Sequence, residues 1–481
     1  MTKFFLDEHG CAKNQVDAEI IISRLSDCNF VQTHDATRAD IIIINSCGFI
    51  ESAKKESINA VLAAKKKYPA AKILLTGCLA ERYAHVFKES LPEADGIFGN
   101  GDLTKIDDVV RALKNGFRPI VTPKQEGICC GNRKTLLSFP GSAYVKITEG
   151  CSNHCTFCAI PLIRGEVRSR AASDILAEIQ QLVMRGVYEI NLIGQDVAAY
   201  GTGQNDNVFG TGTFPLPHID EHGVNCGTDA PSALSLLLRK IDKLAGDFVV
   251  RLLYIHPDHF NRDILPVMHG SRHLLPYFDI PFQSGDDALI QAMNRRGSAK
   301  EYARLVADIR AVLPKSAIRT TFLTGFPGET EENAENTRAF LKTIQSDWSG
   351  CFPYSREENT GAYALKNRVP KKVAVERAQI LERMQEQITR ERLLARCGKS
   401  YDVLIEEVIA DEGLAIGRAF FQAPDVDGNV VVRYNMQKDD VRAGNVARVV
   451  ADSVSGVDID AHFIATVRIA SNNSGLFFRA K

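Results

Sequence analysis

Three cysteines crowd into eight residues in the central motif of this chain. Cys151, Cys155 and Cys158 have the spacing C-x3-C-x2-C and directly follow an alternating apolar run. Thiolates at this spacing chelate a soft metal centre, and iron–sulfur clusters and zinc are the usual occupants. No fourth cysteine or histidine follows at short range, although His154 lies inside the loop. The simplest occupant is therefore a cubane with one iron open to an exogenous ligand. A structural zinc knuckle is the alternative, but a closed zinc site normally has four ligands.

Three further cysteines occupy equivalent positions in the first part of the chain. Cys11, Cys47 and Cys78 each follow the carboxyl end of an expected strand, in turns that contain small residues. In an open parallel sheet these ends share one edge, so three thiols far apart in sequence can meet around one ion or cluster. The alternative is that they are buried apolar side chains, which is common for cysteine. Small-residue turns are a poor place for a packing residue, so we favour the ligand interpretation.

The composition describes an ordinary soluble protein of several domains. Its 481 residues are 45% hydrophobic and 24% charged. This length suggests roughly three domains of about 150 residues each. No run of about 18 apolar residues is present and the N-terminus lacks the features of a secretory signal, so we expect a cytoplasmic protein with no membrane partner. In the cytosol its 12 cysteines are expected to be ligands or free thiols. With a net charge of −1, any nucleic-acid partner would need a local basic patch.

Alternating strands and helices position the N-terminal cysteines. Residues 1–116 are expected to form a doubly wound α/β domain with a parallel sheet, in which the β-branched run at 41–45 is a buried strand. Residues 117–141 are an expected linker, because prolines and glycines interrupt any regular element. The adjacent Cys129 and Cys130 of this linker are interpreted as incidental exposed thiols, since no partner spacing supports a metal site.

The central cysteine motif opens a second α/β domain, residues 142–396. Six strand-like runs alternate with helices, which predicts a partial (β/α)6 barrel followed by one long helix. In such barrels the chemistry lies at the carboxyl ends of the strands, and the motif follows the first strand. Loops on the same face supply the expected cofactor and substrate contacts, among them Gln195 after the second strand and Thr321 and Gly325 at the fifth. Residues 201–231 have no periodicity and are an expected surface insertion.

The last part of the chain is rich in short β-runs. Residues 397–470 contain five such runs with glycines at the turns, which predicts a small β-barrel followed by a tail at 471–481. This barrel region holds 7 Lys and Arg but 12 Asp and Glu, a net charge of −5. A surface of that sign repels phosphate and favours a basic partner.

At the central motif the sequence resembles the radical S-adenosylmethionine superfamily, whose signature C-x3-C-x-aromatic-C is completed by Phe157. The resemblance implies a 4Fe–4S cluster on the three cysteines, with S-adenosylmethionine bound to the open iron. It also implies that the cluster, reduced by an external electron donor, passes an electron to the sulfonium and cleaves it to give a 5'-deoxyadenosyl radical, while the protein holds the cofactor and keeps water out. The cofactor-binding residues expected on this basis are Phe157, Gln195, Thr321 and Gly325.

The N-terminal cysteines narrow the resemblance to the methylthiotransferases, which carry such a three-cysteine domain ahead of the radical domain. The motifs that carry it are Gly10-Cys11-Ala12-Lys13-Asn14, Asn45-Ser46-Cys47-Gly48 and Gly77-Cys78-Leu79-Ala80. The likeness covers nearly the whole chain and implies a second 4Fe–4S cluster on Cys11, Cys47 and Cys78, at which a sulfur species is held and methylated. The C-terminal β-barrel is similar to the TRAM domain of this family, usually described as an RNA-binding module, so RNA contact is a further expectation.

Two branches of this family differ in substrate. One modifies an adenosine in transfer RNA, and the other modifies the β-carbon of an aspartate in small-subunit ribosomal protein twelve. Segments 279–281, 293–297 and 354–360 resemble the ribosomal-protein branch, and the acidic C-terminal region agrees with a basic ribosomal partner. Ala12 and Ser284 depart from that branch's pattern, which keeps transfer RNA as the alternative substrate. The alternative from a different class is a non-catalytic iron–sulfur or zinc protein, which would bind metal without cleaving S-adenosylmethionine.

Overall fold

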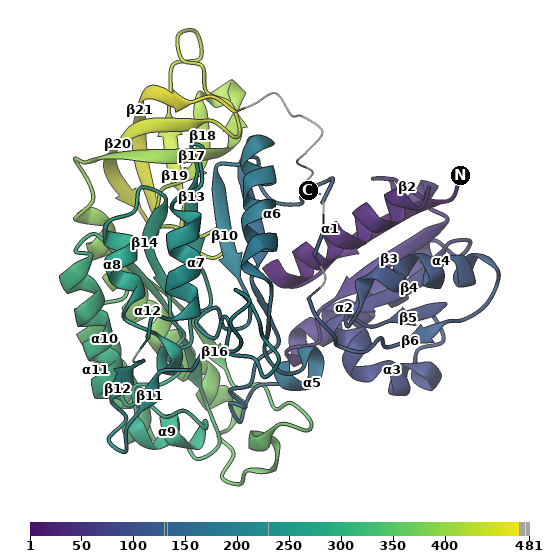
Figure 1. Ribbon diagram of the computed structural model, residues 1–481, viewed down its shortest axis with the longest axis horizontal. Helices are drawn as coiled ribbons and strands as arrows, with labels where there is room; N and C mark the ends of the chain where they lie inside the picture. The colour runs from purple at the N-terminus through teal and green to yellow at the C-terminus, as the bar shows by residue number, and fades with distance from the viewer. Residues whose placement is uncertain (129, 132, 229, 471–476, 478–481) are drawn as a thin grey trace.

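The computed structural model describes residues 1–470, except 129, 132 and 229, together with Phe477. Cys129 and the expected tail at 471–481, apart from Phe477, lie outside the described residues. Figure 1 shows three lobes: an N-terminal α/β lobe, a central α/β lobe, and a β-barrel that packs against one end of the central sheet. The three architectures expected from the sequence are confirmed.

A six-stranded parallel sheet forms the N-terminal lobe, in the order β2-β1-β3-β4-β5-β6. Its strands are β1 (Lys3–Glu8), β2 (Val31–Gln32), β3 (Ile41–Ser46), β4 (Lys72–Gly77), β5 (Gly96–Phe98) and β6 (Ile120–Val121). Its helices are α1 (Ala12–Asp27), α2 (Glu51–Lys67), α3 (Cys78–Ser90) and α4 (Ile106–Lys114). Every residue of β3 is buried, because α1 and α4 cover one face of the sheet and α2 and α3 the other. The strand β6 lies within the segment that the sequence predicts to be a linker.

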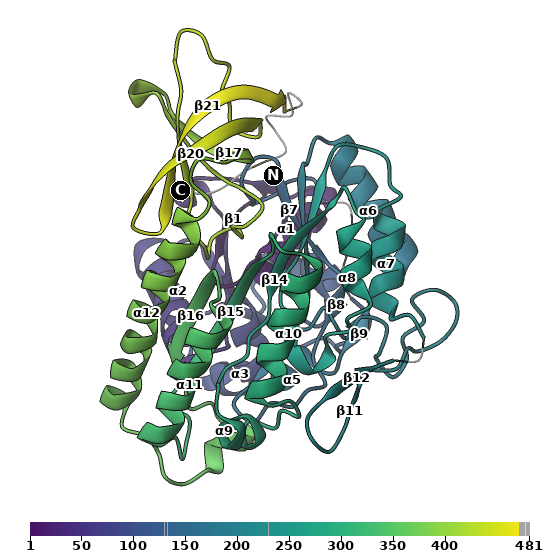
Figure 2. The ribbon, with the colours of Figure 1, turned by 90° about the vertical axis from the view of Figure 1, so that its left-hand side faces the viewer.

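Six parallel strands in the order β16-β15-β14-β13-β10-β7 curve into the expected partial barrel (Figure 2). The strands are β7 (Ser142–Lys146), β10 (Glu189–Ile193), β13 (Val249–Leu252), β14 (Leu274–Asp279), β15 (Ala317–Thr324) and β16 (Trp348–Pro353). The helices between them are α6 (Ala172–Met184), α7 (Ala233–Ile241), α8 (Ile264–His269), α9 (Asp287–Ala292), α10 (Ala299–Val312) and α11 (Glu331–Ile344). The barrel is open on one side, and α1 of the N-terminal lobe packs against its edge strand β7.

Shorter elements complete the central lobe. Between β7 and α6 lie β8 (Thr148–Glu149), α5 (Ile160–Arg164) and β9 (Arg168–Ser169). The insertion at 201–231 carries an antiparallel hairpin of β11 (His218–Ile219) and β12 (Asn225–Gly227). The expected long helix is α12 (Lys371–Leu394), which packs on β16 and leads up to the C-terminal barrel (Figure 2).

The C-terminal barrel is closed by five strands in the order β17-β18-β19-β21-β20. They are β17 (Ser400–Ile409), β18 (Leu414–Arg418), β19 (Val430–Arg433), β20 (Val446–Ser455) and β21 (Asp458–Arg468). Arg418 fastens this barrel to the central sheet, because its buried guanidinium donates to both carboxylate oxygens of Glu189 at 2.9 and 2.7 Å. Asp427 makes a second contact between this barrel and the central sheet. Its buried carboxylate accepts hydrogen bonds from Tyr277 at 2.6 Å and Arg319 at 2.7 Å. Part of the barrel's negative charge therefore faces inward and holds the lobes together.

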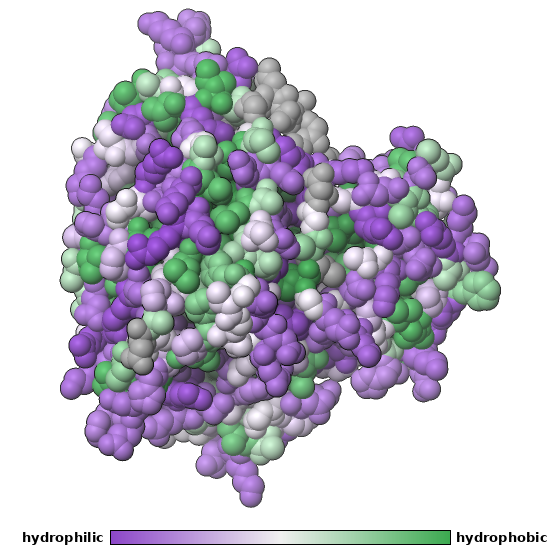
Figure 3. All heavy atoms as spheres, viewed as in Figure 1, coloured by the Kyte–Doolittle hydropathy of each residue, from purple (hydrophilic) through white to green (hydrophobic). Residues whose placement is uncertain are grey.

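The outer surface is largely polar. Hydrophilic side chains cover most of the face shown in Figure 3. None of the helices in the described part of the chain is both long and apolar enough to cross a membrane.

Candidate active site

The central cysteine motif lies in a loop between β8 and α5, at the carboxyl end of the first barrel strand as the sequence predicts. Gly150 makes the turn into this loop with a φ of +77°. A Cβ at this position would lie 2.1 Å from the carbonyl oxygen of Glu166, so only glycine fits. The backbone amide of Cys151 donates to the carbonyl of Gly165 at 3.0 Å and closes the loop. The backbone conformation of this loop therefore determines the position of the Cys151 thiol.

Burial favours the protonated form of these three thiols. It raises the pKa of Cys151 and of Cys155 above the usual range and the pKa of Cys158 to about 12. Such thiols become thiolates when a metal supplies compensating charge. In the described part of the chain, no three His, Cys, Asp or Glu side chains converge closely enough to ligate a single ion. The ligands of a cubane bind different irons, so they need not converge on one point.

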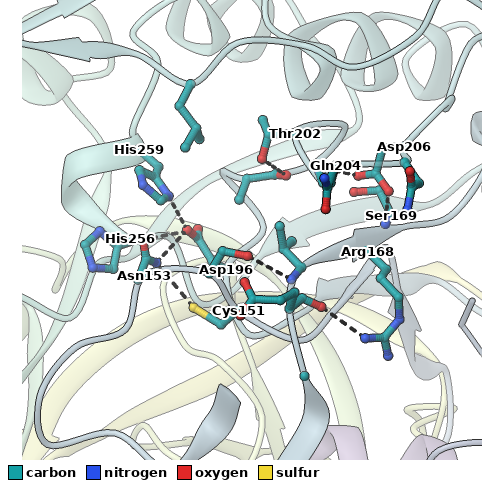
Figure 4. Close-up of a pocket in the computed structure, with 18 of the residues that line it drawn as sticks. Cys151, Asn153, Arg168, Ser169, Asp196, Thr202, Gln204, Asp206, His256 and His259 are labelled. Carbon is teal, nitrogen blue, oxygen red and sulfur yellow. Dashed lines mark hydrogen bonds and ion pairs between the residues drawn. The ribbon is translucent and has the colours of Figure 1, made fainter. Parts of the chain in front are cut away.

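A series of hydrogen-bonded polar side chains supports the cysteine loop on the side that faces the cavity drawn in Figure 4. Asn153 donates from Nδ2 to the Sγ of Cys151 at 3.3 Å and to Oδ2 of Asp196 at 3.2 Å. The ring of His259 lies 2.6 Å from the same carboxylate oxygen. Burial opposes ionisation of Asp196, but the charge of His259 and its hydrogen bond hold the pKa of Asp196 at about 2. Asp196 therefore orients the loop that carries the first thiol.

Cys155 is approached by two nitrogen donors. The Nε2 atom of His256 lies 3.8 Å from its Sγ, while Nδ1 of the same ring accepts a hydrogen bond from the backbone amide of Asp258 at 3.3 Å. Because Nδ1 is an acceptor, the ring proton lies on Nε2 and faces the sulfur. Burial lowers the pKa of His256 well below its usual value, so the ring is neutral. The guanidinium of the buried Arg295 is a second nitrogen donor close to Cys155, and its charge opposes the rise in the pKa of this thiol. Sequence reasoning missed both donors, since neither residue belongs to a ligand-spacing pattern.

The N-terminal cysteines lie together at one edge of the parallel sheet, beyond the ends of β1, β3 and β4. The lack of space at the neighbouring glycines shows that the segments carrying these cysteines lie close together. A Cβ on Gly10 would lie 3.2 Å from the Cβ of Cys47, and a Cβ on Gly48 would lie 2.7 Å from the carbonyl oxygen of Cys78. Burial raises the pKa of Cys47 to about 12 and that of Cys78 above its usual value, whereas Cys11 is exposed. The topology thus brings together the three thiols that the sequence assigns to one ligand set.

A buried ionic network joins the two cysteine sets. Arg164, at the end of α5, donates to the Sγ of Cys78 at 3.3 Å and to Asp17 on α1 at 2.9 Å. Glu149, just before the central cysteine loop, is a further partner of this guanidinium at 2.7 Å. Lys146 bridges Asp17 and Glu149 at 2.6 and 2.7 Å. Because both carboxylates are shared by both cations, the loop of one set and the helix behind the other are fixed relative to each other.

A cavity of about 1160 Å³ opens where the three lobes meet, and Cys11 is part of its wall. Tyr254 and Thr321 line it from the central barrel. The charged residues in the wall are Asp7, Glu8, Asp279, Asp425 and Arg319, together with His34. The guanidinium of Arg319 is already paired with Asp427 at 2.7 Å. The cavity wall is therefore acidic.

Of the expected cofactor-binding residues, Thr321 is part of this cavity's wall, whereas Gln195 follows β10 and Phe157 lies in the central cysteine loop. Gln195 donates from Nε2 to Glu149 at 3.2 Å, but its Oε1 is buried with no hydrogen-bond partner. A buried acceptor without a donor is rare, and an amino group of a ligand would satisfy it. Thr321 lines the cavity, and Phe157 packs beside the buried Phe326 at the same end of the barrel.

Gly325 has different surroundings from those expected. A Cβ there would lie 2.2 Å from the Cβ of Ala374, so the glycine is required for the packing of α12 against the barrel. Glu329, four residues further on, accepts hydrogen bonds from the Gly325 amide at 2.5 Å and from Arg377 of α12 at 2.8 Å. Both residues thus serve the attachment of the trailing helix.

Comparison with known proteins gives the class of this molecule. Family models match the uncharacterized protein family UPF0004 over residues 3–99, the Radical SAM superfamily over 145–341 and the TRAM domain over 397–464. Among solved structures, the fold is similar to the radical S-adenosylmethionine methyltransferase TsrM from Kitasatospora setae, with a TM-score of 0.53 and 12% identity over 75% of this chain and 77% of that one. At this identity the likeness concerns the fold alone. Fold and family models together define a radical S-adenosylmethionine enzyme.

Relatives along the whole chain specify the family. The ribosomal protein uS12 methylthiotransferase RimO of Treponema denticola is 48% identical, over 95% of this chain and 99% of that protein. Proteins of the same name from Syntrophomonas wolfei and a Thermoanaerobacter species are each 36% identical over 88% of this chain and 92% of their own lengths. The chain belongs to the ribosomal protein uS12 methylthiotransferase family and is a transferase. Membership in the radical superfamily implies a 4Fe–4S cluster and S-adenosylmethionine as cofactors.

Proposed function

We propose that this enzyme adds a methylthio group to the β-carbon of an aspartate in ribosomal protein uS12, using two 4Fe–4S clusters. One cluster would be held by Cys151, Cys155 and Cys158, and the other by Cys11, Cys47 and Cys78. The observation that carries this proposal is the pair of three-thiol sets on adjacent lobes, linked by the 3.3 Å contact between Arg164 and Cys78. A protein that used metals only to hold its domains together would not need a cavity beside each set, whereas Cys151 lines one large cavity and Cys11 lines another.

The chain's own residues have distinct tasks in this proposal. The bound groups supply a carbon radical, after reduction by an external electron donor, and a transferable sulfur. Gln195 would accept a hydrogen bond from the amino group of S-adenosylmethionine through its unpartnered Oε1. Thr321 and Phe157 would bound the nucleoside, and Gly325 could add only its backbone, since its side-chain position is filled by α12. The buried network of Arg164 and its carboxylates would keep water out between the two sets.

The cavity supports a basic protein substrate over a nucleic acid. Its wall holds four carboxyl groups, and its one guanidinium is neutralised by Asp427. Burial raises the pKa of Glu8 to about 7 and that of Asp279 above its usual value, so an incoming cation would favour their ionised forms. The net charge of −5 on residues 397–470 has the same sign. Ribosomal proteins are basic, whereas the phosphates of transfer RNA would be repelled. The proposal places the enzyme with ribosomes, in the cytoplasm.

Iron counting after anaerobic reconstitution tests the two-cluster part of the proposal. We expect about eight iron atoms per chain. Replacing Cys151, Cys155 and Cys158 by alanine should halve the iron and abolish release of 5'-deoxyadenosine from S-adenosylmethionine. Replacing Cys11, Cys47 and Cys78 should also halve the iron but leave that cleavage, with no sulfur insertion. Full iron content in either triple variant would refute the ligand assignment, and metal binding without any cleavage by the unmodified enzyme would support the non-catalytic alternative.

A further inference from the structure

A further large cavity lies away from the two cysteine sets, at the opposite ends of the central strands. It has a volume of about 940 Å³, within the range of ligand pockets. Its walls come from the start of β10 and β13, the last turns of α12, and β17 and β18 of the C-terminal barrel. Figures 1 and 2 show the C-terminal barrel seated on this end of the central sheet, beside the end of α12. The proposed function assigns nothing to this cavity.

The cavity is rich in cations, and three of them have no ion-pair partner in the described part of the chain. Arg272, Lys315 and Lys399 are exposed at its wall. Lys399 donates only to the carbonyl of Ala395 at 2.7 Å, and Arg272 only to the ring of His273 at 3.1 Å. These three groups leave a local positive charge on a molecule whose net charge is −1.

The remaining charged residues of the wall, apart from the exposed Glu391, are already paired within the protein. Arg251 and Arg418 pair with Glu189, and Arg392 and Arg396 pair with Asp347. A second exposed acid of the wall, Asp402, pairs with Arg448, which lies outside the cavity wall. The net charge that an incoming ligand meets is therefore positive, because Arg272, Lys315 and Lys399 outnumber Glu391.

Aromatic rings and unpartnered polar atoms add to these cations. Tyr188, Tyr401 and Phe420 line the cavity and are each half-buried, so a ring face or edge is open to it. Ser316 and Arg251 are each 1% exposed, and the Oγ of the first and the Nε of the second have no hydrogen-bond partner. Buried polar atoms in this state are satisfied by a ligand or by water. Cations interleaved with aromatic side chains form the kind of surface that takes phosphates and stacked bases together.

We infer that this cavity binds a segment of single-stranded RNA, with phosphates at Arg272, Lys315 and Lys399 and bases against Tyr401 and Phe420. The aromatic walls favour RNA over an acidic peptide, because carboxylates would use the cations but not the exposed parts of the rings, which already pack against one another. The acidic surface elsewhere on the C-terminal barrel does not oppose this, because charges beyond about 10 Å are largely screened at 0.1 M salt. RNA would thus bind at the junction of the C-terminal barrel, α12 and the central sheet, while the acidic cavity at Cys11 remains free.

Fluorescence anisotropy of a labelled single-stranded RNA of about ten nucleotides tests this inference on the full-length enzyme. The triple variant Arg272→Glu, Lys315→Glu, Lys399→Glu should bind it at least tenfold more weakly at about 0.1 M salt. The slope of log affinity against log salt should fall by about 2 units, because each lost phosphate contact on a single strand is worth about 0.7. The single variant Lys315→Gln, which is less disruptive to folding, should lower the slope by about 0.7.

A control with the same change in charge distinguishes a specific RNA-binding site from general electrostatic attraction. Lys66→Glu, Lys88→Glu, Lys114→Glu reverses three exposed cations of the N-terminal lobe and should leave RNA affinity nearly unchanged. Equal loss of affinity in both triple variants, or none in the first, would overturn the inference. Binding of a poly-glutamate peptide in place of RNA would assign the cavity to an acidic protein, and binding of adenosine monophosphate as tight as that of RNA would assign it to a free nucleotide. Both outcomes would contradict the inference that the cavity binds single-stranded RNA. Release of 5'-deoxyadenosine should be the same in all of these variants.

Discussion

The guanidinium of Arg164 lies 3.3 Å from the Sγ of Cys78, although the two residues belong to different lobes. Arg164 ends the short helix that follows the central cysteine loop, and Cys78 opens α3 of the N-terminal lobe. The same guanidinium holds Asp17 and Glu149, so one buried cation touches the thiol of one set and the carboxylate that precedes the other. The relative position of the two cysteine sets therefore depends on this side chain.

Replacing Arg164 by methionine should lower the free energy of unfolding by about 3–5 kcal/mol, because it leaves buried carboxylates short of a cation. Arg164→Lys should recover part of the loss, since it keeps the charge but not the forked geometry. Arg448→Met, which breaks an exposed pair with Asp402, should cost no more than about 1 kcal/mol. Urea unfolding of the apoprotein measures all three variants. Equal stability of Arg164→Met and Arg448→Met would show that the network does not hold the lobes together.

Replacing His256 by leucine should make the midpoint potential of the central cluster more negative. A hydrogen bond from Nε2 to the ligand sulfur stabilises the reduced, more electron-rich cluster, and leucine cannot provide it. Redox titration followed by electron paramagnetic resonance measures the shift. His269→Leu, at an exposed position on α8, is the matched control and should leave the potential unchanged. A potential that is unchanged, or raised, in His256→Leu would mean that this ring does not donate to Cys155.

Reversing the charge at the mouth of the acidic cavity should slow modification of the ribosomal protein. Asp425→Lys places a cation where a basic substrate would enter, so we expect a higher KM for uS12 that depends on salt, with unchanged release of 5'-deoxyadenosine. Glu332→Lys, at an exposed position on α11, is the control with the same charge change. The same KM in both variants would leave the acidic wall as a solvated surface with no part in docking.

Asp427 illustrates which features of this structure could be predicted from the sequence and which could not. Charge counting groups it with the acids of the C-terminal surface, but its carboxylate is buried and fastens the barrel to Tyr277 and Arg319. Composition gives the sign of a region's charge, not the direction in which each side chain points. The parallel sheet and the shared edge of Cys11, Cys47 and Cys78 were predictable, because parallel strands end at the same edge.

Other residues of the site could not be predicted, because no local sequence pattern marks them. Arg164 and His256 act on cysteines that are distant in sequence, and only the packing of the lobes brings them together. Strands β2 and β6 have two residues each, too few for a periodicity. Gly325 suggested a ligand contact, yet the close approach it allows is that of Ala374 on α12. A glycine in a loop shows that something approaches closely but does not identify it.

Mass spectrometry of uS12 tests the central claim most directly. Ribosomes would be isolated from cells that lack the enzyme and are supplied with the unmodified chain, the Cys11→Ala, Cys47→Ala, Cys78→Ala variant, or the Cys151→Ala, Cys155→Ala, Cys158→Ala variant. The account predicts a methylthio group on one aspartate of uS12 with the unmodified chain, no such group with either variant, and unchanged nucleosides in transfer RNA. A methylthio group that appears only on transfer RNA adenosine, or modification of uS12 by the variant without its N-terminal cysteines, would contradict it.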